Sequence, residues 1–434
     1  MYQQQLLSKI AERTARIGVI GLGYVGLPLA LGWARAGFRV TGLDVDERRV
    51  DLCRQGLSWI SDVPSDELAE LVQGGYLTAT TDMAALTGLD AVSICVPTPL
   101  NKTKDPDITA VLSAVEAIST YLQRGQLIVL ESTTYPGTTD ELILPRLSQT
   151  GLSVGGDFFL AFSPERTDPG NVRFGLRNTP KVVAGITPAC LELVAALYRT
   201  IVDTVIPVSS TRVAELVKLL ENMFRAVNIG MVNELAIIAD LLDVNVWEVI
   251  SAAATKPFGF MPFYPGPGLG GHCIPVDPHY LAWKLRTLNY KTRFIEVASE
   301  INGQMPRYVV ERITAAMNEA GKCLNGSRIL IVGVTYKRDV ADLRESPALD
   351  IIELLHLRKA RIAYADPYIP LLKLAETTLE AVPLDEEQLR NADCVVIVTD
   401  HRVFDYAAIT ATASLIVDTR NATAGMVGSH IGRL

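Results

Sequence analysis

A glycine-rich turn near the start of the chain constrains the fold more than any other stretch. Residues 16–45, RIGVIGLGYVGLPLALGWARAGFRVTGLDV, place a β-rich run, spaced glycines, a helix-like stretch and a second β-rich run in order. Gly21 permits a tight turn, Gly23 lets a diphosphate approach the backbone, and Gly26 lets helix pack on strand. Asp44 lies where a carboxylate accepts hydrogen bonds from a ribose and repels a 2′-phosphate. The stretch predicts an NAD site in preference to the alternative, a glycine turn without a ligand.

The alternation of β-rich and amphipathic stretches continues through the first half of the chain. Apolar runs begin at residues 16, 39, 91, 127, 158 and 204. Such alternation is typical of a doubly wound parallel sheet. It resumes after residue 327, where we expect a helix to begin at Pro347. The predicted fold class is α/β, with two Rossmann-like doubly wound domains joined by a long central helix.

The segment predicted to form that central helix covers residues 211–244. Its apolar side chains recur on one helical stripe, made by Val213, Leu216, Val217, Leu220, Phe224, Val227, Met231, Leu235, Ile238 and Leu242. About 30 helical residues make a rod of roughly 45 Å, which can join two domains and pack against a second copy of itself. Lys218 and Asn222 lie one turn apart, opposite the stripe. A surface lysine is the alternative to a functional one at this position.

Composition and charge exclude several classes of protein. With 49% hydrophobic and 20% charged residues, the chain is typical of a soluble globular protein. A formal net charge of −8 argues against a nucleic-acid groove. The six cysteines are scattered without metal-ligand spacing, so we expect reduced thiols, a cytoplasmic protein and no metal. The most apolar long segment, residues 227–246, carries charges that a membrane span does not tolerate.

The second αβ half lacks the dinucleotide signature. Only Gly333 follows its first β-rich run, but the stretch GVTYKRDVADLRESP places Lys337, Arg338 and Arg344 just beyond the expected strand. Ligands of such sheets bind at the carboxyl ends of the strands. Three cations there favour a phosphorylated ligand, with a solvated charge run as the alternative.

Cys273 lies in a loop rich in glycine and proline, GPGLGGHCIPVDP at residues 266–278. A small buried hydrophobe is one interpretation of a free cysteine, and a reactive thiol is the other. Oxidation of an alcohol by NAD needs no cysteine, whereas oxidation of an aldehyde to an acid does benefit from one. Addition of a thiolate gives a thiohemiacetal, which donates a second hydride and leaves a thioester for water to hydrolyse. Together with the glycine turn, the loop therefore indicates a two-step oxidation.

These motifs in this order resemble the UDP-glucose/GDP-mannose dehydrogenases, NAD-dependent enzymes that oxidise nucleotide sugars by four electrons. The motifs are GLGYVGLPLA, VPTPL, ESTTYPGTT, FSPER, AELVKLLEN, GPGLGGHCIPVDP and YKRDVADLRESP, and they span nearly the whole chain. The resemblance implies an NAD-binding domain at residues 1–208 and a central helical region, at 209–312, that forms a dimer and carries the cysteine loop. It implies a UDP-binding domain at residues 313–434, and a homodimer or higher homo-oligomer.

The resemblance also implies roles for individual side chains. Cys273 is the expected nucleophile, and Asp277 polarises the site and orients water. Lys218 and Asn222 are expected to stabilise the oxyanion of the tetrahedral intermediates. Thr133 would hold a water, and Glu165 would act as the base for hydrolysis. The expected NAD contacts are Gly21, Gly23, Tyr24, Val25, Gly26, Asp44, Arg49, Thr98, Thr133 and Arg344. The expected contacts with the UDP-sugar are Glu165, Lys218, Asn222, Tyr264, Gly266, Gly270, Lys337 and Arg420.

Two departures from the UDP-glucose branch concern the sugar. Pro169 replaces a second glutamate after SPE, and His272 replaces a serine before the cysteine. Both changes favour a UDP-N-acetylhexosamine, with UDP-N-acetylglucosamine the best match and UDP-N-acetylmannosamine or UDP-glucose as alternatives. A one-step β-hydroxyacid dehydrogenase explains neither Cys273 nor the second αβ half. A non-catalytic sensor of NAD or nucleotide on the same scaffold would leave the cysteine and its neighbours idle.

Overall fold

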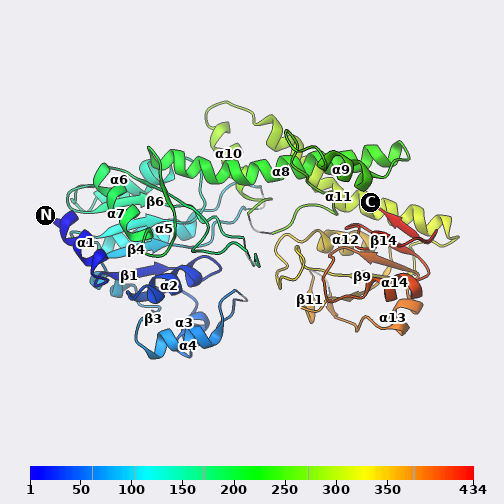
Figure 1. Ribbon diagram of the computed structural model, residues 1–434, viewed down its shortest axis with the longest axis horizontal. Helices are drawn as coiled ribbons and strands as arrows, with labels where there is room; N and C mark the ends of the chain where they lie inside the picture. Colours follow the sequence, from blue (N-terminus) through cyan, green and yellow to red (C-terminus); the bar gives the residue numbers. More distant parts are fainter. Residues whose placement is uncertain (61, 102, 169, 172, 272, 375–376) are drawn as a thin grey trace. The chain divides into compact units, whose positions relative to one another are not determined.

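The computed structural model describes residues 1–434 except 61, 102, 169, 172, 272 and 375–376 (Figure 1). The chain forms two compact units. The first unit contains Met1–Glu221 and His279–Tyr290, and the second contains Asn222–Pro278 and Lys291–Leu434. Helix α8 (Thr211–Leu241) begins in the first unit and ends in the second.

A twisted sheet with the strand order β3-β2-β1-β4-β5-β6-β7-β8 forms the centre of the first unit. Its strands are β1 (Arg16–Ile20), β2 (Arg39–Leu43), β3 (Leu77–Thr80), β4 (Ala91–Ile94), β5 (Leu127–Leu130), β6 (Phe159–Phe162), β7 (Lys181–Gly185) and β8 (Val205–Pro207). Every β-rich run predicted in this half is confirmed, and β3 and β7 are additional. Strand β7 runs antiparallel to β6, whereas the other neighbours in this sheet run parallel. The reason is local: between β6 and β7 the described residues form no helix of the kind that a parallel crossover needs.

Helices cover both faces of this sheet. Apolar side chains of α1 (Tyr2–Ala11), α2 (Gly26–Arg35), α3 (Glu47–Arg54), α4 (Ser65–Gln73) and α7 (Pro188–Tyr198) form one core. Side chains of α5 (Thr109–Tyr121), α6 (Leu144–Ser148) and the short helical turns η1 (Met83–Gly88) and η2 (Thr138–Ile143) form the other. Two cores on opposite faces are the mark of a doubly wound sheet.

The second unit is built on a parallel sheet with the strand order β10-β9-β13-β14-β15. Its strands are β9 (Arg328–Val332), β10 (Arg361–Ala365), β13 (Cys394–Ile397), β14 (Ile416–Asp418) and β15 (Ile431–Arg433), with a small hairpin of β11 (Leu371–Lys373) and β12 (Thr378–Glu380). Helices α11 (Arg293–Glu319) and α12 (Pro347–Leu357) cover one face, and α13 (Glu386–Asn391) and α14 (Tyr406–Thr412) cover the other. Helix α12 begins at Pro347, as predicted.

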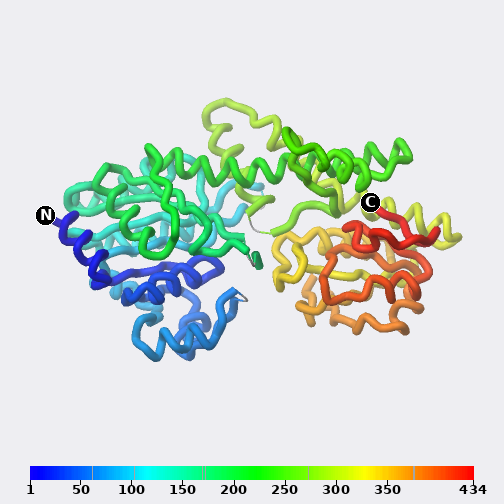
Figure 2. Tube along the Cα trace, viewed as in Figure 1, coloured from blue at the N-terminus to red at the C-terminus, as the bar shows by residue number. Residues whose placement is uncertain are grey.

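The end of the chain is anchored on the helical part of the second unit. Figure 2 traces the chain from β14 to the C-terminal strand β15 at the edge of the sheet. There the indole N–H of Trp247, on α9 (Val246–Ala254), donates to the backbone oxygen of Leu434 at 2.6 Å.

Helix α10 (Asp277–Arg286) belongs mostly to the first unit, where Trp283 packs on Tyr135 with ring centroids 5.0 Å apart.

The central helix carries its apolar stripe on the outside of the chain. Leu220 and Met231 are each 54% exposed and Leu242 is 67% exposed, whereas Leu219 and Val232 on another face are buried. The periodicity correctly predicted the helix but not which face its own chain covers. A helix that is apolar on two faces needs two sets of neighbours, so the exposed stripe is available to a second molecule.

Candidate active site

The glycine turn has the geometry that a dinucleotide requires. Gly21 has φ +92° and donates its N–H to the carbonyl of Leu43 at 2.7 Å. A Cβ on Gly26 would lie 1.8 Å from the carbonyl oxygen of Gly21, so only glycine lets α2 start here. A Cβ on Gly23 would meet no atom within 4 Å. Open space above Gly23, at the N-terminus of α2, suits the diphosphate of NAD.

Asp44 is fixed at the end of β2. Its carboxylate accepts from the backbone N–H of Leu22 at 2.7 Å and of Asp46 at 2.9 Å, and Arg49 lies 3.5 Å away. The structure therefore brings together five of the predicted NAD residues, namely Gly21, Gly23, Gly26, Asp44 and Arg49. Tyr24 and Val25 lie in the same turn, just before α2.

Two further predicted residues lie at the carboxyl ends of neighbouring strands. Thr98 follows β4 and Thr133 follows β5. Ser132, next to Thr133, donates from its hydroxyl to the carbonyl of Val96 at 2.7 Å, which ties the two loops together. The carboxyl edge of a doubly wound sheet is where ligands bind.

Glu215 holds the loop after Thr133 against α8, and sequence reasoning missed it. Its buried carboxylate accepts from the N–H of Gly137 at 2.6 Å, from the N–H of Thr139 at 2.9 Å and from the hydroxyl of Thr139 at 2.7 Å. Burial outweighs these hydrogen bonds and raises the pKa of Glu215 to about 7. Lys218 lies one turn further along α8 and is buried, so its interpretation as a surface lysine is wrong. An acidic residue in the apolar run AELVKLLEN was the signal for Glu215.

Glu165 lies in a cluster of buried charges that the sequence did not indicate. One oxygen of its carboxylate accepts from the N–H of Arg166 at 2.8 Å and of Thr167 at 2.6 Å, and the other lies 3.0 Å from the ammonium of Lys181. Burial alone would raise the pKa of Glu165, but the charge of Lys181 and the bonds from Thr167 outweigh it and hold the pKa at about 2. The carboxylate is therefore ionised at neutral pH.

The cysteine loop leads directly into α10. Cys273 is exposed, so its interpretation as a buried hydrophobe is wrong. Its carbonyl accepts from the N–H of Asp277 at 2.8 Å, which makes Cys273 the start of the first turn before α10. A helix N-terminus favours a thiolate over a thiol. The carboxylate of Asp277 accepts from the side-chain amide of Asn222 at 2.5 Å, so the structure brings these two predicted residues together.

The rest of this loop is attached to the second unit by polar contacts. The N–H of Gly266 donates to Asn233 of α8 at 2.9 Å, and Asn233 in turn donates to Asn302 of α11 at 2.8 Å. Sequence reasoning missed both asparagines. The feature that could have indicated them is a side-chain amide at a position within the apolar pattern of each helix. The N–H of Gly271 donates to the carbonyl of Arg344 at 2.9 Å.

The predicted sugar-binding residues of the second unit lie around this loop. A Cβ on Gly266 would lie 2.8 Å from the guanidinium of Arg420, whose pKa burial lowers to about 10. A Cβ on Gly270 would lie 2.5 Å from the side chain of Tyr336, next to Lys337. Tyr264 stacks on Trp247 with ring centroids 6.0 Å apart.

Arg344 pairs with Asp342 at 2.6 Å within the second unit. Pro169 and His272 lie outside the described residues.

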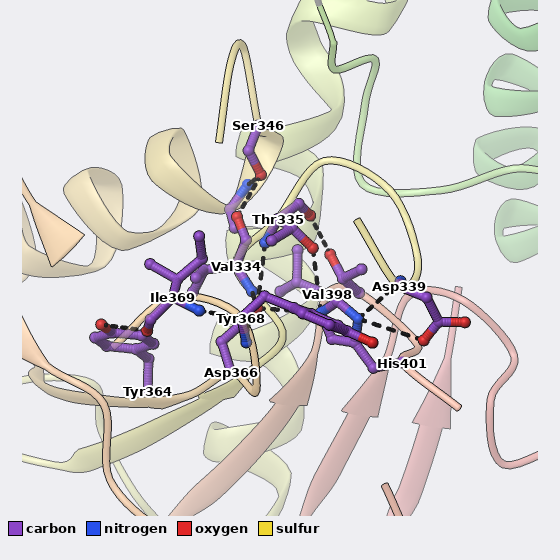
Figure 3. A network of polar contacts seen from close by, with 12 residues as sticks. Val334, Thr335, Asp339, Ser346, Tyr364, Asp366, Tyr368, Ile369, Val398 and His401 are labelled. Atoms are coloured by element: carbon purple, nitrogen blue, oxygen red, sulfur yellow. Dashed lines mark hydrogen bonds and ion pairs between the residues drawn. The ribbon is translucent and has the colours of Figure 1, made fainter. Parts of the chain in front are cut away.

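A buried polar network supports the loop that carries Lys337. Figure 3 shows Thr335, Asp366 and His401 converging from the loop after β9, the end of β10 and the loop after β13. His401 Nδ1 accepts from the N–H of Asp339 at 3.0 Å, which assigns the proton to Nε2. Nε2 then donates to Asp366, 3.1 Å away. The loop is thus fixed at both ends, at Thr335 and at Asp339.

Two kinds of feature are absent from the part of the chain that the structure describes. None of the helices described combines the length and the apolar composition that a membrane span requires. Nor does any group of three or more His, Cys, Asp or Glu side chains there have the arrangement of a metal site.

Three consecutive segments match descriptions of one protein family. Residues 15–202 match the NAD binding domain of the UDP-glucose/GDP-mannose dehydrogenase family, residues 212–304 its central domain, and residues 330–425 its UDP binding domain. The chain is 34% identical over 391 residues to the UDP-N-acetyl-D-glucosamine 6-dehydrogenase of Salmonella typhi, covering 90% of each protein. It is 35% identical over 394 residues to the UDP-N-acetyl-D-mannosamine dehydrogenase of Methanococcus maripaludis strain C7, covering 90% of this chain and 87% of that protein.

A solved structure agrees with these matches. The UDP-D-ManNAc dehydrogenase of Pyrococcus horikoshii has a TM-score of 0.88 and 32% identity, covering 96% of this chain and 98% of that one. The predicted Rossmann-like order and the NAD requirement are therefore confirmed. The chain belongs to the UDP-glucose/GDP-mannose dehydrogenase family and is an NAD-dependent enzyme that acts on a UDP-sugar.

Proposed function

We propose that this enzyme oxidises the C6 hydroxyl of a UDP-N-acetylhexosamine, preferably UDP-N-acetylglucosamine, to the uronic acid in two steps. The observation that carries the proposal is the exposed thiol of Cys273 at the start of the turn before α10, beside the Asn222–Asp277 pair. NAD, when bound, accepts the hydride of each oxidation, and the glycine turn with Asp44 would hold it.

The side chains have separate tasks in this scheme. In the first oxidation C6 loses a hydride and its hydroxyl group loses a proton to water, which gives an aldehyde. The Cys273 thiolate adds to the aldehyde carbon and forms a thiohemiacetal, whose oxyanion Lys218 and Asn222 stabilise. Loss of a second hydride leaves a thioester. Water, held by Thr133 and oriented by Glu165 and Asp277, then releases the acid and restores the thiol.

The choice of sugar rests on the sequence and on the relatives. Relatives of similar identity are named as acting on UDP-N-acetylglucosamine and on UDP-N-acetylmannosamine, so the acetamido group is the feature they share. A pocket that bonds this amide is left with unpaired polar groups when glucose binds, at a cost of about 1–3 kcal/mol for each group. Two such groups predict a preference of roughly a hundredfold in catalytic efficiency over UDP-glucose.

A panel of substrates tests this proposal. NADH formation is measured with UDP-N-acetylglucosamine, UDP-N-acetylmannosamine, UDP-glucose and GDP-mannose at matched concentrations. The expected order places UDP-N-acetylglucosamine first and UDP-glucose far behind. Equal efficiencies for UDP-glucose and UDP-N-acetylglucosamine would contradict the sugar assignment. Binding of the sugars without any turnover would instead favour a sensor.

The exposed stripe on α8 supports a second part of the proposal, a homodimer. Leu220, Met231 and Leu242 present apolar surface that monomers rarely leave in contact with water. Light scattering of the purified chain gives the assembly directly. The division of the chain at residues 208 and 312 stays a prediction.

A further inference from the structure

The first unit contains a buried ion cluster whose lysine has no role in the scheme above. Lys181 begins β7, and its ammonium lies 2.8 Å from a carboxylate oxygen of Glu131 and 3.0 Å from one of Glu165. The side chain of Lys181 is 3% exposed and that of Glu131 is fully buried. A buried lysine of this kind needs compensating charge, and here it has two carboxylates.

The inner end of the cluster is fixed by the core. Glu131 follows β5, and its second oxygen accepts a hydrogen bond from the hydroxyl of Tyr198. Tyr198 is fully buried on α7, against Trp33 with ring centroids 5.5 Å apart. The ammonium of Lys181 also lies 5.4 Å from the centroid of the Tyr198 ring. The ammonium is therefore held in place from the core side.

The outer end of the cluster is the catalytic candidate Glu165. Its side chain is 14% exposed, and the N–H groups of Arg166 and Thr167 bind the oxygen that Lys181 does not. Arg166 is tied in turn to Glu221 of α8 at 2.6 Å. Each oxygen of Glu165 thus has its own donors, which fixes the plane of the carboxylate.

The charges of the cluster depend on one another. Burial raises the pKa of Glu131 to about 7 even beside Lys181, whereas the pKa of Glu165 is about 2. Without the ammonium, two neighbouring carboxylates would share a site of low polarity, and at least one would take up a proton at neutral pH. Loss of the ammonium also removes the largest influence that lowers the pKa of Glu165, so this carboxylate would take up a proton at a higher pH.

We infer that Lys181 is a positioning residue for Glu165: it keeps that carboxylate ionised and aimed, while Glu131 and Tyr198 hold the ammonium in place. The inference rests on the proposed function, in which Glu165 orients the water that hydrolyses the thioester. Lys181 acts only through Glu165 and needs no contact with the sugar.

A charge-balanced pair of variants tests this role. Lys181→Met with Glu131→Gln removes one positive and one negative charge, so the fold keeps its net charge. Glu131→Gln alone is the matched control, because it leaves Lys181 beside Glu165. Lys181→Arg tests rescue, since a guanidinium also binds two carboxylates. Thermal unfolding and NADH binding show that each variant is folded.

The pH dependence of acid formation is the first measurement. In the double variant we expect the acid limb of the profile to move up by at least one pH unit. Glu131→Gln and Lys181→Arg should keep the wild-type limb. A double variant with the same profile as Glu131→Gln would overturn the inference.

A second measurement does not depend on turnover. The ¹³C signal of the Glu165 carboxyl, assigned by its loss in Glu165→Gln, should stay that of an ion down to about pH 4 in the wild type. In the double variant it should titrate at a higher pH. An unchanged titration overturns the role of Lys181, even if the wild type proves inactive on every UDP-sugar. Absence of acid formation by the wild type, with the expected ¹³C shift, would contradict only the proposed function.

Discussion

The two αβ halves of the molecule begin with the same local structure. Gly21 after β1 and Gly333 after β9 both have a positive φ, and each donates its N–H to the neighbouring strand, at 2.7 Å and 2.9 Å. An aspartate ends that neighbouring strand in each half. Asp44 accepts from the N–H of Leu22, and Asp366 from the N–H of Val334, both at 2.7 Å.

The two turns differ in the segment that leads from the glycine to the next helix. Helix α2 begins at Gly26, directly after the first turn, whereas α12 begins only at Pro347, after a long loop that carries Lys337. Asp44 has the partly exposed Arg49 as its charged neighbour, whereas Asp366 is fully buried and bound by His401. A short turn leaves a helix N-terminus and a carboxylate for a dinucleotide. A long loop replaces both with its own side chains, so the scaffold alone does not decide the ligand.

The largest expected effect is on acid formation, after substitution of Cys273, a residue that lies in neither glycine turn. Cys273→Ser should lower acid formation on the order of 10³-fold or more, because the second oxidation needs the thiolate. NADH and UDP should still bind with wild-type affinity, since neither turn contains the cysteine. Calorimetric titration and product analysis of the same preparation measure both. Acid formation near the wild-type rate would rule out the covalent route.

The next effect tests whether the two glycines are equivalent. A Cβ would lie 2.6 Å from the carbonyl oxygen of Cys95 at Gly21 and 2.2 Å from that of Thr399 at Gly333. Gly21→Ala and Gly333→Ala should each lower the free energy of unfolding by about 1–3 kcal/mol or more. Gly23→Ala meets open space, so it should keep the stability and weaken only NADH binding. A lower free energy of unfolding for Gly23→Ala, or an unchanged one for Gly333→Ala, would contradict this explanation of the glycine positions.

Asp366 should make stability depend on pH in the second half. Burial would raise the pKa of Asp366, but hydrogen bonds from His401 and from the N–H groups of Val334 and Tyr368 outweigh burial and lower the pKa from its ordinary value. A carboxylate whose folded-state pKa is depressed stabilises the fold above its unfolded pKa, and this is lost as pH falls through the folded value. Asp366→Asn should therefore cost about 1–3 kcal/mol near pH 7.

The pH range over which Asp366→Asn lowers the free energy of unfolding tests this explanation. Free energies of unfolding of Asp366→Asn and the wild type should converge as pH falls below about 4. A difference that stays constant from pH 7 to pH 3 would mean that the ionised form of Asp366 is not the stabilising one.

The smallest expected effect concerns cofactor choice in the first half. Asp44→Ala removes the carboxylate that would repel a 2′-phosphate, so the preference for NAD over NADP should fall about tenfold. Asp366→Ala, the matching change in the second half, should leave that preference unchanged. Steady-state kinetics with both cofactors compare the variants, and an unchanged ratio for Asp44→Ala would remove Asp44 from cofactor selection.

Local sequence patterns predicted the helices, strands and turns better than they predicted the contacts between side chains from separate segments. The glycine turn, the strands on both sides of it and the start of α12 at Pro347 depend on residues close together in the chain. The cluster of Lys181, Glu131 and Glu165 does not, because its members come from three separate segments that only the sheet brings together. The same holds for His401 and Asp366. Periodicity placed the stripe on α8 but carries no information on which apolar face the rest of the chain covers.

The direct test of the central claim, a four-electron oxidation through Cys273, is the amount of NADH formed per sugar. A limiting amount of UDP-N-acetylglucosamine is converted to completion with excess NAD, and the product is identified by mass. Two NADH per sugar, with the uronic acid as the product, is the result expected. One NADH per sugar, with an aldehyde or ketone as the product, would contradict the account.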